Sequence, residues 1–194
     1  WVYYENDSSK LNYNVTENYI EPMKLPQYYQ ADDRWGTKRY GLSNMKLTGC
    51  VPTALAMAIS GLKEDVNPVQ VADFLYVMTM ELNTTFLGTS SLGVQEVVSQ
   101  WGLNYKVIDS KEELEETLKS GTLVYGAVGH GIFVNGYSTH AVLLTGYENG
   151  KTKAFDPDNM AKTNKWYNID DIWKERSLAP EDNMTGGAFI AIYK

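Results

Sequence analysis

The segment that decides the fold reads Thr48-Gly49-Cys50-Val51-Pro52-Thr53-Ala54-Leu55-Ala56-Met57-Ala58. Pro52 suits the first turn of a helix, where its missing N–H would have no partner, and the alanine-rich run that follows has high helix propensity. The pattern predicts a helix that begins near Cys50 and ends at Gly61. A thiol at that position lies at the positive end of the helix dipole, which favours the nucleophilic thiolate.

Cys50 is the only cysteine among 194 residues, so the chain has no internal disulfide. A lone cysteine is often a small buried core residue, and its chemistry therefore depends on what the rest of the chain supplies. Two histidines and one cysteine do not suffice for a structural zinc site. We expect neither a metal nor a cofactor.

The bulk composition is that of one globular domain with a real hydrophobic core. Hydrophobic residues make up 43% and charged residues 21% of the chain. A net charge of -7 and the lack of a basic stripe argue against a nucleic-acid partner. No stretch approaches the roughly 20 apolar residues of a membrane span. The chain begins with Trp1 rather than Met, which we interpret as removal of the natural start by processing or by cloning design.

The first half of the chain is predicted to be mostly helical. Residues 1–24 are polar and rich in Tyr and Asn, and we expect an N-terminal extension, an arm or one edge strand, ahead of a domain over 25–194. Residues 25–47 have no helical period and predict an ordered loop. A second helix is predicted to begin at Asn67-Pro68, with Val69, Val71, Ala72, Leu75, Tyr76 and Met80 on one face, and a loop follows over 83–89. Two more helices are predicted, one from Ser90 or Ser91 to Gly102 and one from Ser110 to Gly121.

The second half changes to the two-residue period of strands. Strands are predicted over 123–128, 141–147, 152–155, 166–167 and 188–193, with a short helix over 170–175. The turn at 148–151 joins two of these strands in a hairpin. Helices followed by an antiparallel sheet indicate an α+β domain.

A nucleophilic Cys50 needs a base, and the chain offers His130 and His140. His140 directly precedes a predicted strand, whereas glycines flank His130 in a predicted loop. A base must be held within hydrogen-bond reach of the thiol, and a strand holds a side chain more rigidly than a loop does. We therefore favour His140 as the base and expect His130 to be an exposed loop residue.

Asp156 is the candidate group that orients His140. It ends the strand that pairs with the His140 strand, and in a tight hairpin the beginning of one strand lies beside the end of the next. Asp158 and Asn159 are alternatives, and the segment is also typical of a simple turn. A carboxylate or amide on the second ring nitrogen is the usual way to orient a catalytic histidine.

An oxyanion donor is expected from Gln30, which stands 20 residues before Cys50 (50 minus 30). Its side-chain amide and the backbone N–H of Cys50 together suit a developing negative oxygen. Spacing alone does not separate Gln30 from the nearby Gln27.

The order of these residues along the chain resembles that of papain-like cysteine peptidases. More narrowly, the chain is similar over residues 25–193 to the bacteriocin-processing (double-glycine leader) peptidase-like family, as a stand-alone bacterial member. The similarity lies in Gln30-x-Asp32-x-x-Trp35, Tyr40-Gly41, Gly49-Cys50-x-Pro52-Thr53, His140-Ala141-Val142 and Asp156-Pro157.

The resemblance implies a papain-like fold, in which the helical half carries Cys50 and the antiparallel sheet carries His140 and Asp156. It implies Cys50 as nucleophile, His140 as general base and acid, Asp156 as the orienting group and Gln30 as oxyanion donor. Val51 departs from the small residue that commonly follows the cysteine in this family.

The function expected from this resemblance is hydrolysis of peptide, isopeptide or amide bonds, with a peptide or protein as substrate, cell-wall peptide included. An amidase or a transpeptidase would use the same triad, and a catalytically silent surface binding module would keep only the fold. Stand-alone members are often exported, so the resemblance implies an extracellular or cell-surface location in a Gram-positive bacterium. Residues 1–24 lie outside the similarity, and no transporter segments accompany it.

Overall fold

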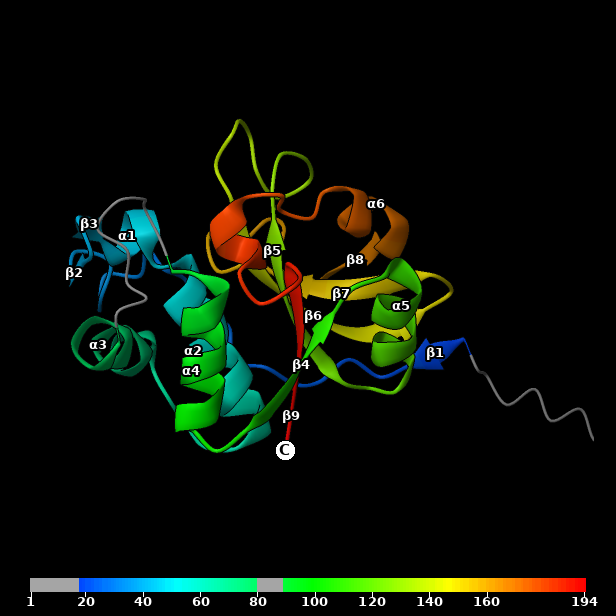
Figure 1. Ribbon diagram of the computed structural model, residues 1–194, viewed down its shortest axis with the longest axis horizontal. Helices are drawn as coiled ribbons and strands as arrows, with labels where there is room; N and C mark the ends of the chain where they lie inside the picture. Colours follow the sequence, from blue (N-terminus) through cyan, green and yellow to red (C-terminus); the bar gives the residue numbers. More distant parts are fainter. Residues whose placement is uncertain (1–17, 80–88) are drawn as a thin grey trace, which may run out of the picture.

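An antiparallel sheet separates two groups of helices in this fold (Figure 1). The computed structural model describes residues 18–79 and 89–194. Helices α2, α3 and α4 cover one face of the sheet, and α5 and α6 cover the other. The architecture is therefore α+β, as predicted, with the first helices on one side of the sheet.

The elements have the following bounds. The helices are α1 (Met45–Thr48), α2 (Cys50–Leu62), α3 (Pro68–Met78), α4 (Ser91–Gln100), α5 (Lys111–Lys119), α6 (Ile169–Lys174) and the short 3-10 helix η1 (Pro180–Asn183). The strands are β1 (Tyr19–Ile20), β2 (Arg39–Tyr40), β3 (Ser43–Asn44), β4 (Asn104–Ile108), β5 (Leu123–Val128), β6 (His140–Glu148), β7 (Lys151–Phe155), β8 (Lys165–Asn168) and β9 (Phe189–Tyr193).

The main sheet has the order β4-β9-β5-β6-β7-β8, and every neighbouring pair is antiparallel. The central strands β5 and β6 are buried on both faces. Alternate residues of β5 point to opposite sides, so Leu123 and Tyr125 pack against α2 and its neighbours while Val124 and Val128 pack toward α5 and α6. Two hydrophobic cores, one on each face, hold the helices to the sheet.

Helix α2 begins at Cys50, and most of its 13 residues are buried. The predicted end at Gly61 is wrong, because the helix continues to Leu62. Gly61 is instead a packing residue. A Cβ there would lie 2.3 Å from Leu25 Cδ2, so the glycine lets the segment around Leu25 cross the helix closely.

Most other predicted elements are confirmed. Asn67 and Gln70 form a capping box at α3, and Ser90 and Ser110 cap α4 and α5. Strand β4 was not predicted from the sequence, and the expected loop over 25–47 instead contains β2, β3 and most of α1. Tyr76 was placed on the buried face of α3 but is 52% exposed. Met80 and residues 83–88 of the predicted loop lie outside the described residues.

The described part of the predicted N-terminal extension is an edge strand, β1, paired with the end of β6. Tyr19 lies opposite Glu148, and the N–H of Met23 donates to Thr145 Oγ1 at 2.9 Å. Gly146, with φ 73°, allows Pro22 to approach the bulged strand closely. His140 begins β6, so about 26 Å of extended strand separate it from the pair of Tyr19 and Glu148.

Gly49 joins α1 to α2 at a point where the backbone leaves no room for a side chain. A Cβ at Gly49 would lie 2.4 Å from the carbonyl oxygen of Met45. We expect Gly49→Ala to lower the free energy of unfolding by about 1–3 kcal/mol, measured by urea denaturation, because backbone must move to accommodate the methyl group. The matched control is Gly129→Ala, whose added Cβ would lie 3.7 Å from its nearest neighbour. Equal stability of the two variants would contradict this account.

Candidate active site

A cleft of about 630 Å³ opens between the N-terminus of α2 and the beginning of β6. Residues from distant parts of the chain line it. They are Gln30, Leu47, Thr48, Cys50, Phe133, Val134, Asn135, Tyr137, Ser138, Thr139, His140, Asp158, Asn159, Lys162, Ala179 and Glu181. Three of the four residues predicted from the sequence therefore reach one cleft, and the fourth, Asp156, lies directly behind it.

Cys50 is the first residue of α2 and is partly buried. The N-cap residue Gly49 has no side chain that could accept from the first helical N–H groups. These N–H groups have no partners within the helix, and they carry the positive end of its dipole. The thiol thus lies where a negative charge is stabilised.

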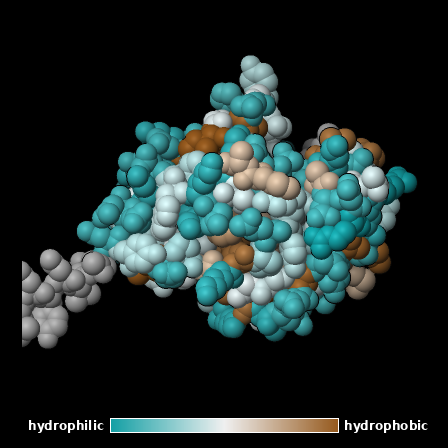
Figure 2. All heavy atoms as spheres, turned by 180° about the vertical axis from the view of Figure 1, so that it is seen from behind, coloured by the Kyte–Doolittle hydropathy of each residue, from teal (hydrophilic) through white to brown (hydrophobic). Residues whose placement is uncertain are grey.

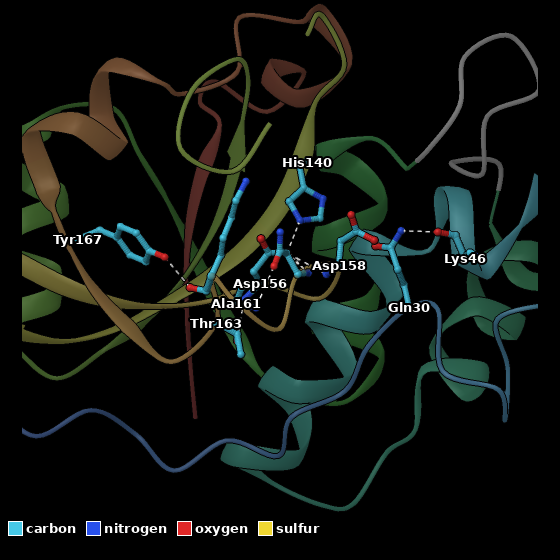
Figure 3. Close-up of polar contacts among 10 residues, drawn as sticks. Gln30, Lys46, His140, Asp156, Asp158, Ala161, Thr163 and Tyr167 are labelled. Carbon is cyan, nitrogen blue, oxygen red and sulfur yellow. Dashed lines mark hydrogen bonds and ion pairs between the residues drawn. The ribbon is translucent and has the colours of Figure 1, made fainter. Parts of the chain in front are cut away.

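His140 and Asp156 are in direct contact. The Nε2 atom of His140 lies 2.7 Å from Asp156 Oδ1, at the end of the β6–β7 hairpin where Leu143 lies opposite Phe155 (Figure 3). His140 and Asp156 are thus neighbours in the hairpin, as predicted from the sequence. His130 is exposed, as predicted, and its ring contacts the backbone of Gly136 rather than the cleft.

Asp156 is 1% exposed, and its neighbours hold it in place. Its Oδ1 accepts hydrogen bonds from the backbone N–H groups of Asp158 at 2.8 Å and Asn159 at 3.1 Å. Its own N–H donates to Thr163 Oγ1 at 3.0 Å. Asp158 and Asn159, the two alternatives for the orienting group, thus support Asp156 through their backbone.

The environment of His140 favours its protonated form. Burial, the largest influence, lowers the pKa of the imidazole, but the hydrogen bond with Asp156 and the hydrogen bond and charge of Cys50 outweigh it. The result is a pKa raised from 6.5 to about 10. An imidazolium beside a thiolate is the charge arrangement of an activated cysteine.

Gln30 connects the two sides of the cleft. Its backbone N–H donates to the carbonyl of Pro157 at 2.8 Å, next to Asp156. Its side-chain Nε2 donates to the carbonyl of Lys46 at 2.8 Å, in the helix that precedes Cys50 (Figure 3). Gln27 accepts from Tyr29 and lies away from this cleft, so the structure distinguishes the two glutamines.

Trp35 supports the turn that carries Gln30. Its indole Nε1 donates to the carbonyl of Tyr29 at 2.7 Å, and its backbone N–H donates to the carbonyl of Asp32 at 3.0 Å. The ring is buried, 5% exposed. The spacing Gln30-x-Asp32-x-x-Trp35 is therefore a structural unit that orients a side chain into the cleft.

A buried carboxylate that the sequence did not single out supports the part of the cleft wall that contains Thr139. Asp182 is 7% exposed and accepts from Ser177 Oγ at 2.5 Å and from Thr139, the residue before His140. Burial raises the pKa of Asp182, and these two hydrogen bonds oppose the shift. Ser177 precedes η1 and Asp182 lies within it, five residues later, a spacing that carries no recognisable pattern.

The comparison with protein families agrees with this geometry. The profile of the Peptidase C39-like family matches residues 23–185. The chain belongs to this family. The family resemblance found in the sequence is thereby confirmed, and no match is found among curated proteins.

Solved structures with the same fold support the assignment of the architecture. A protein from Bacillus anthracis described as a C39-like peptidase has 15% identity and a TM-score of 0.62, with 91% of this chain and 98% of that chain covered. The peptidase domain of Streptococcus ComA, a bifunctional ABC transporter in a quorum-sensing pathway, has 18% identity and a TM-score of 0.54, with 81% of this chain and 96% of that chain covered. A double glycine motif protease from an AMS/PCAT transporter, in complex with the leader peptide, has 17% identity and a TM-score of 0.52, with 91% of this chain and 96% of that chain covered.

Among residues 18–79 and 89–194, no group of three or more His, Cys, Asp or Glu side chains is placed to hold a metal ion. Within the same ranges, no helix has both the length and the hydropathy that crossing a membrane requires.

The pKa of His140 gives a testable pH dependence. Asp156→Asn removes a group that raises this pKa, so the imidazolium is lost at a lower pH and the thiolate loses its positive partner. We expect iodoacetamide to alkylate Cys50 at about pH 6 at least about tenfold more slowly in Asp156→Asn than in the wild type. The control is Asp170→Asn, which removes an exposed carboxylate paired with Lys111. Equal rates at this pH in Asp156→Asn and the wild type would contradict the prediction.

Proposed function

We propose that this protein is a cysteine peptidase that hydrolyses peptide or isopeptide bonds, with Cys50 as nucleophile and His140 as general base and acid. Asp156 orients the imidazole, and Gln30 stabilises the oxyanion. The observation that carries the proposal is the 2.7 Å contact between His140 Nε2 and Asp156 Oδ1, combined with a Cys50 side chain that raises the pKa of the same imidazole.

The first step uses the two nitrogens of His140 differently. Nε2 shares its proton with Asp156, which leaves Nδ1 to accept the proton of the thiol. The thiolate at the N-terminus of α2 then attacks the carbonyl carbon of the substrate. Because Asp156 is buried and its Oδ1 accepts three hydrogen bonds, the imidazole keeps one orientation while its charge changes.

The developing oxyanion needs donors that are already in place. The amide of Gln30 has two N–H groups, and one is held by the carbonyl of Lys46, which fixes the direction of the other. The backbone N–H of Cys50 is among the helix N–H groups that have no partner within α2. Together they supply two donors on one side of the thiol.

The remaining steps follow from the same groups. His140 gives its proton to the leaving amine, and the acyl group remains on Cys50 as a thioester. His140 then removes a proton from water, which attacks the thioester and regenerates the thiol. An amine in place of water would make the reaction a transpeptidation.

Peptide recognition is supported by one structural relative, the double glycine motif protease whose structure contains a leader peptide. The cleft of this chain is lined by exposed apolar side chains, among them Leu47 at 69% and Tyr137 at 106% exposure, which suit an extended chain. The extracellular or cell-surface location of the protein stays a prediction.

Substitutions of the nucleophile and of the oxyanion donor test the proposal. We expect Cys50→Ala to abolish hydrolysis of a fluorescence-quenched peptide library and Gln30→Ala to lower kcat by about 100–1,000-fold. The matched control is Gln27→Ala, which removes the same amide outside the cleft.

Each outcome decides between the alternatives. Unchanged hydrolysis in Cys50→Ala would overturn the mechanism. If the wild type hydrolyses no peptide and its Cys50 is alkylated as slowly as an ordinary thiol, the chain is a binding module that keeps the fold.

A further inference from the structure

A second cavity of about 450 Å³ lies against the first and shares a wall with it. Tyr137, Ser138, Thr139 and Ala179 line both cavities. The second cavity lies between the loop that joins β5 to β6, at the top of Figure 1, and the segment that follows α6. Because Thr139 precedes His140 directly, a substrate chain in the cleft passes close to this cavity.

Arg176 lines the second cavity and is held in a fixed orientation. Its guanidinium carbon lies 4.8 Å from the centroid of the Trp173 ring, and its Nη1 donates to the carbonyl of Trp173 at 3.0 Å. Trp173 in turn stacks on the buried Phe189, with centroids 5.6 Å apart and an interplanar angle of 21°. An arginine ordered in this way loses little entropy when it binds an anion.

The remaining donors of Arg176 have no carboxylate partner among the described residues. The nearest acidic residue in sequence, Glu175, also lines the cavity, but it forms no ion pair with Arg176, and its Oε2 accepts from the backbone N–H of Ile132 at 2.6 Å. Lys174 also lines the cavity, and its Nζ lies 3.8 Å from Asp171 Oδ1. His130 and Tyr137 are the other titratable side chains among the described residues that line this cavity. The guanidinium is thus an oriented cation without a protein counter-ion.

The first cavity has the opposite charge balance. Asp158 and Glu181 line it beside the Cys50–His140 pair, and Lys162 is the one lysine or arginine among the described residues that lines it. An acidic group of a substrate is therefore repelled by the carboxylates of the cleft and attracted by the neighbouring cavity. The side chains of Tyr137 and Leu178, which line the second cavity, are exposed and offer apolar surface to the rest of the substrate residue that carries the acidic group.

We propose that this second cavity, with Arg176 as its anion-binding residue, is a substrate subsite for a carboxylate of the peptide held in the cleft. The carboxylate belongs to an acidic side chain or to the C-terminus of the substrate. A planar guanidinium fork matches a carboxylate in two parallel hydrogen bonds. The inference rests on the proposed peptidase function, and it adds a charge preference to that function.

The test uses fluorescence-quenched peptides in which each position in turn carries Glu, Gln or Lys, and each peptide has a free or an amidated C-terminus. We expect the wild type to favour Glu over Gln, or the free over the amidated end, by about tenfold in kcat/KM at one position. Arg176→Gln reduces this ratio to about one, and Arg176→Glu reverses it in favour of Lys at the same position. Arg176→Lys keeps the charge without the fork, so it retains part of the preference.

The matched control is Arg39→Gln, since Arg39 is exposed and lines neither cavity. We expect the Glu-to-Gln ratio of kcat/KM in Arg39→Gln to equal that of the wild type. An identical Glu-to-Gln ratio in Arg176→Gln and the wild type, or no charge preference at any position, would overturn the proposal. Thermal unfolding of each variant accompanies the kinetics, and a misfolded Arg176→Gln leaves the decision to Arg176→Lys and Arg176→Glu.

A binding measurement separates failure of the subsite from failure of the peptidase function. Fluorescein-labelled Glu and Gln peptides are titrated with Cys50→Ala by fluorescence anisotropy. If no peptide is hydrolysed by the wild type, the proposed function fails, and the subsite is judged on this binding alone. Tighter binding of the Glu peptide that is lost in Cys50→Ala/Arg176→Gln supports the subsite, and equal binding overturns it.

Discussion

Helix α2 packs its alanine-rich surface against the central strands β5 and β6, and this contact sets where the two halves of the site meet. Small side chains bring the helix axis close to the sheet, so the thiol at its first residue lies beside the first residue of β6. Ala54, Ala56 and Ala58 of this helix are fully buried. The reactive groups are thus carried on rigid elements rather than on loops.

Hydrogen bonds at the end of the β6–β7 hairpin then hold the imidazole. Asp156 is buried, and a buried carboxylate is costly unless several donors satisfy it. The donors come from His140 and from the turn that follows Pro157, while Gln30 reaches the carbonyl of Pro157 from the N-terminal side of the chain. One turn therefore supports both the orienting carboxylate and the candidate oxyanion donor.

On the face opposite to Figure 1, hydrophilic and neutral residues predominate, and hydrophobic residues occur in separate patches (Figure 2). At the end of the sheet that carries His140, two adjoining cavities differ in charge, with carboxylates in the cleft and an oriented guanidinium beyond the wall that contains Thr139. This asymmetry is a property of the walls, which come from the β5–β6 loop and the segment between α6 and η1.

Local sequence determined the elements and the chemistry that each one carries. Capping residues such as Asn67 and Ser90, the alternation in β5 and the hairpin turn after Glu148 act over a few residues, so the helices, the central strands and the His140–Asp156 pair were predictable. Strand β4 was not predictable, because its exposed residues lack alternation and it is stabilised by pairing with β9, some 85 residues later (189 minus 104).

Only the tertiary structure decided which glutamine enters the cleft, why Gly61 lies inside a helix, and that Asp182 supports Thr139. These features depend on contacts between segments distant in the chain, and such contacts leave no periodic signal in the sequence. The same reason applies to Arg176, because its guanidinium lies over the ring of Trp173, which stacks on Phe189 of β9. The sequence by itself determined which residues are able to react, and the packing of α2 against the sheet decided which of them meet.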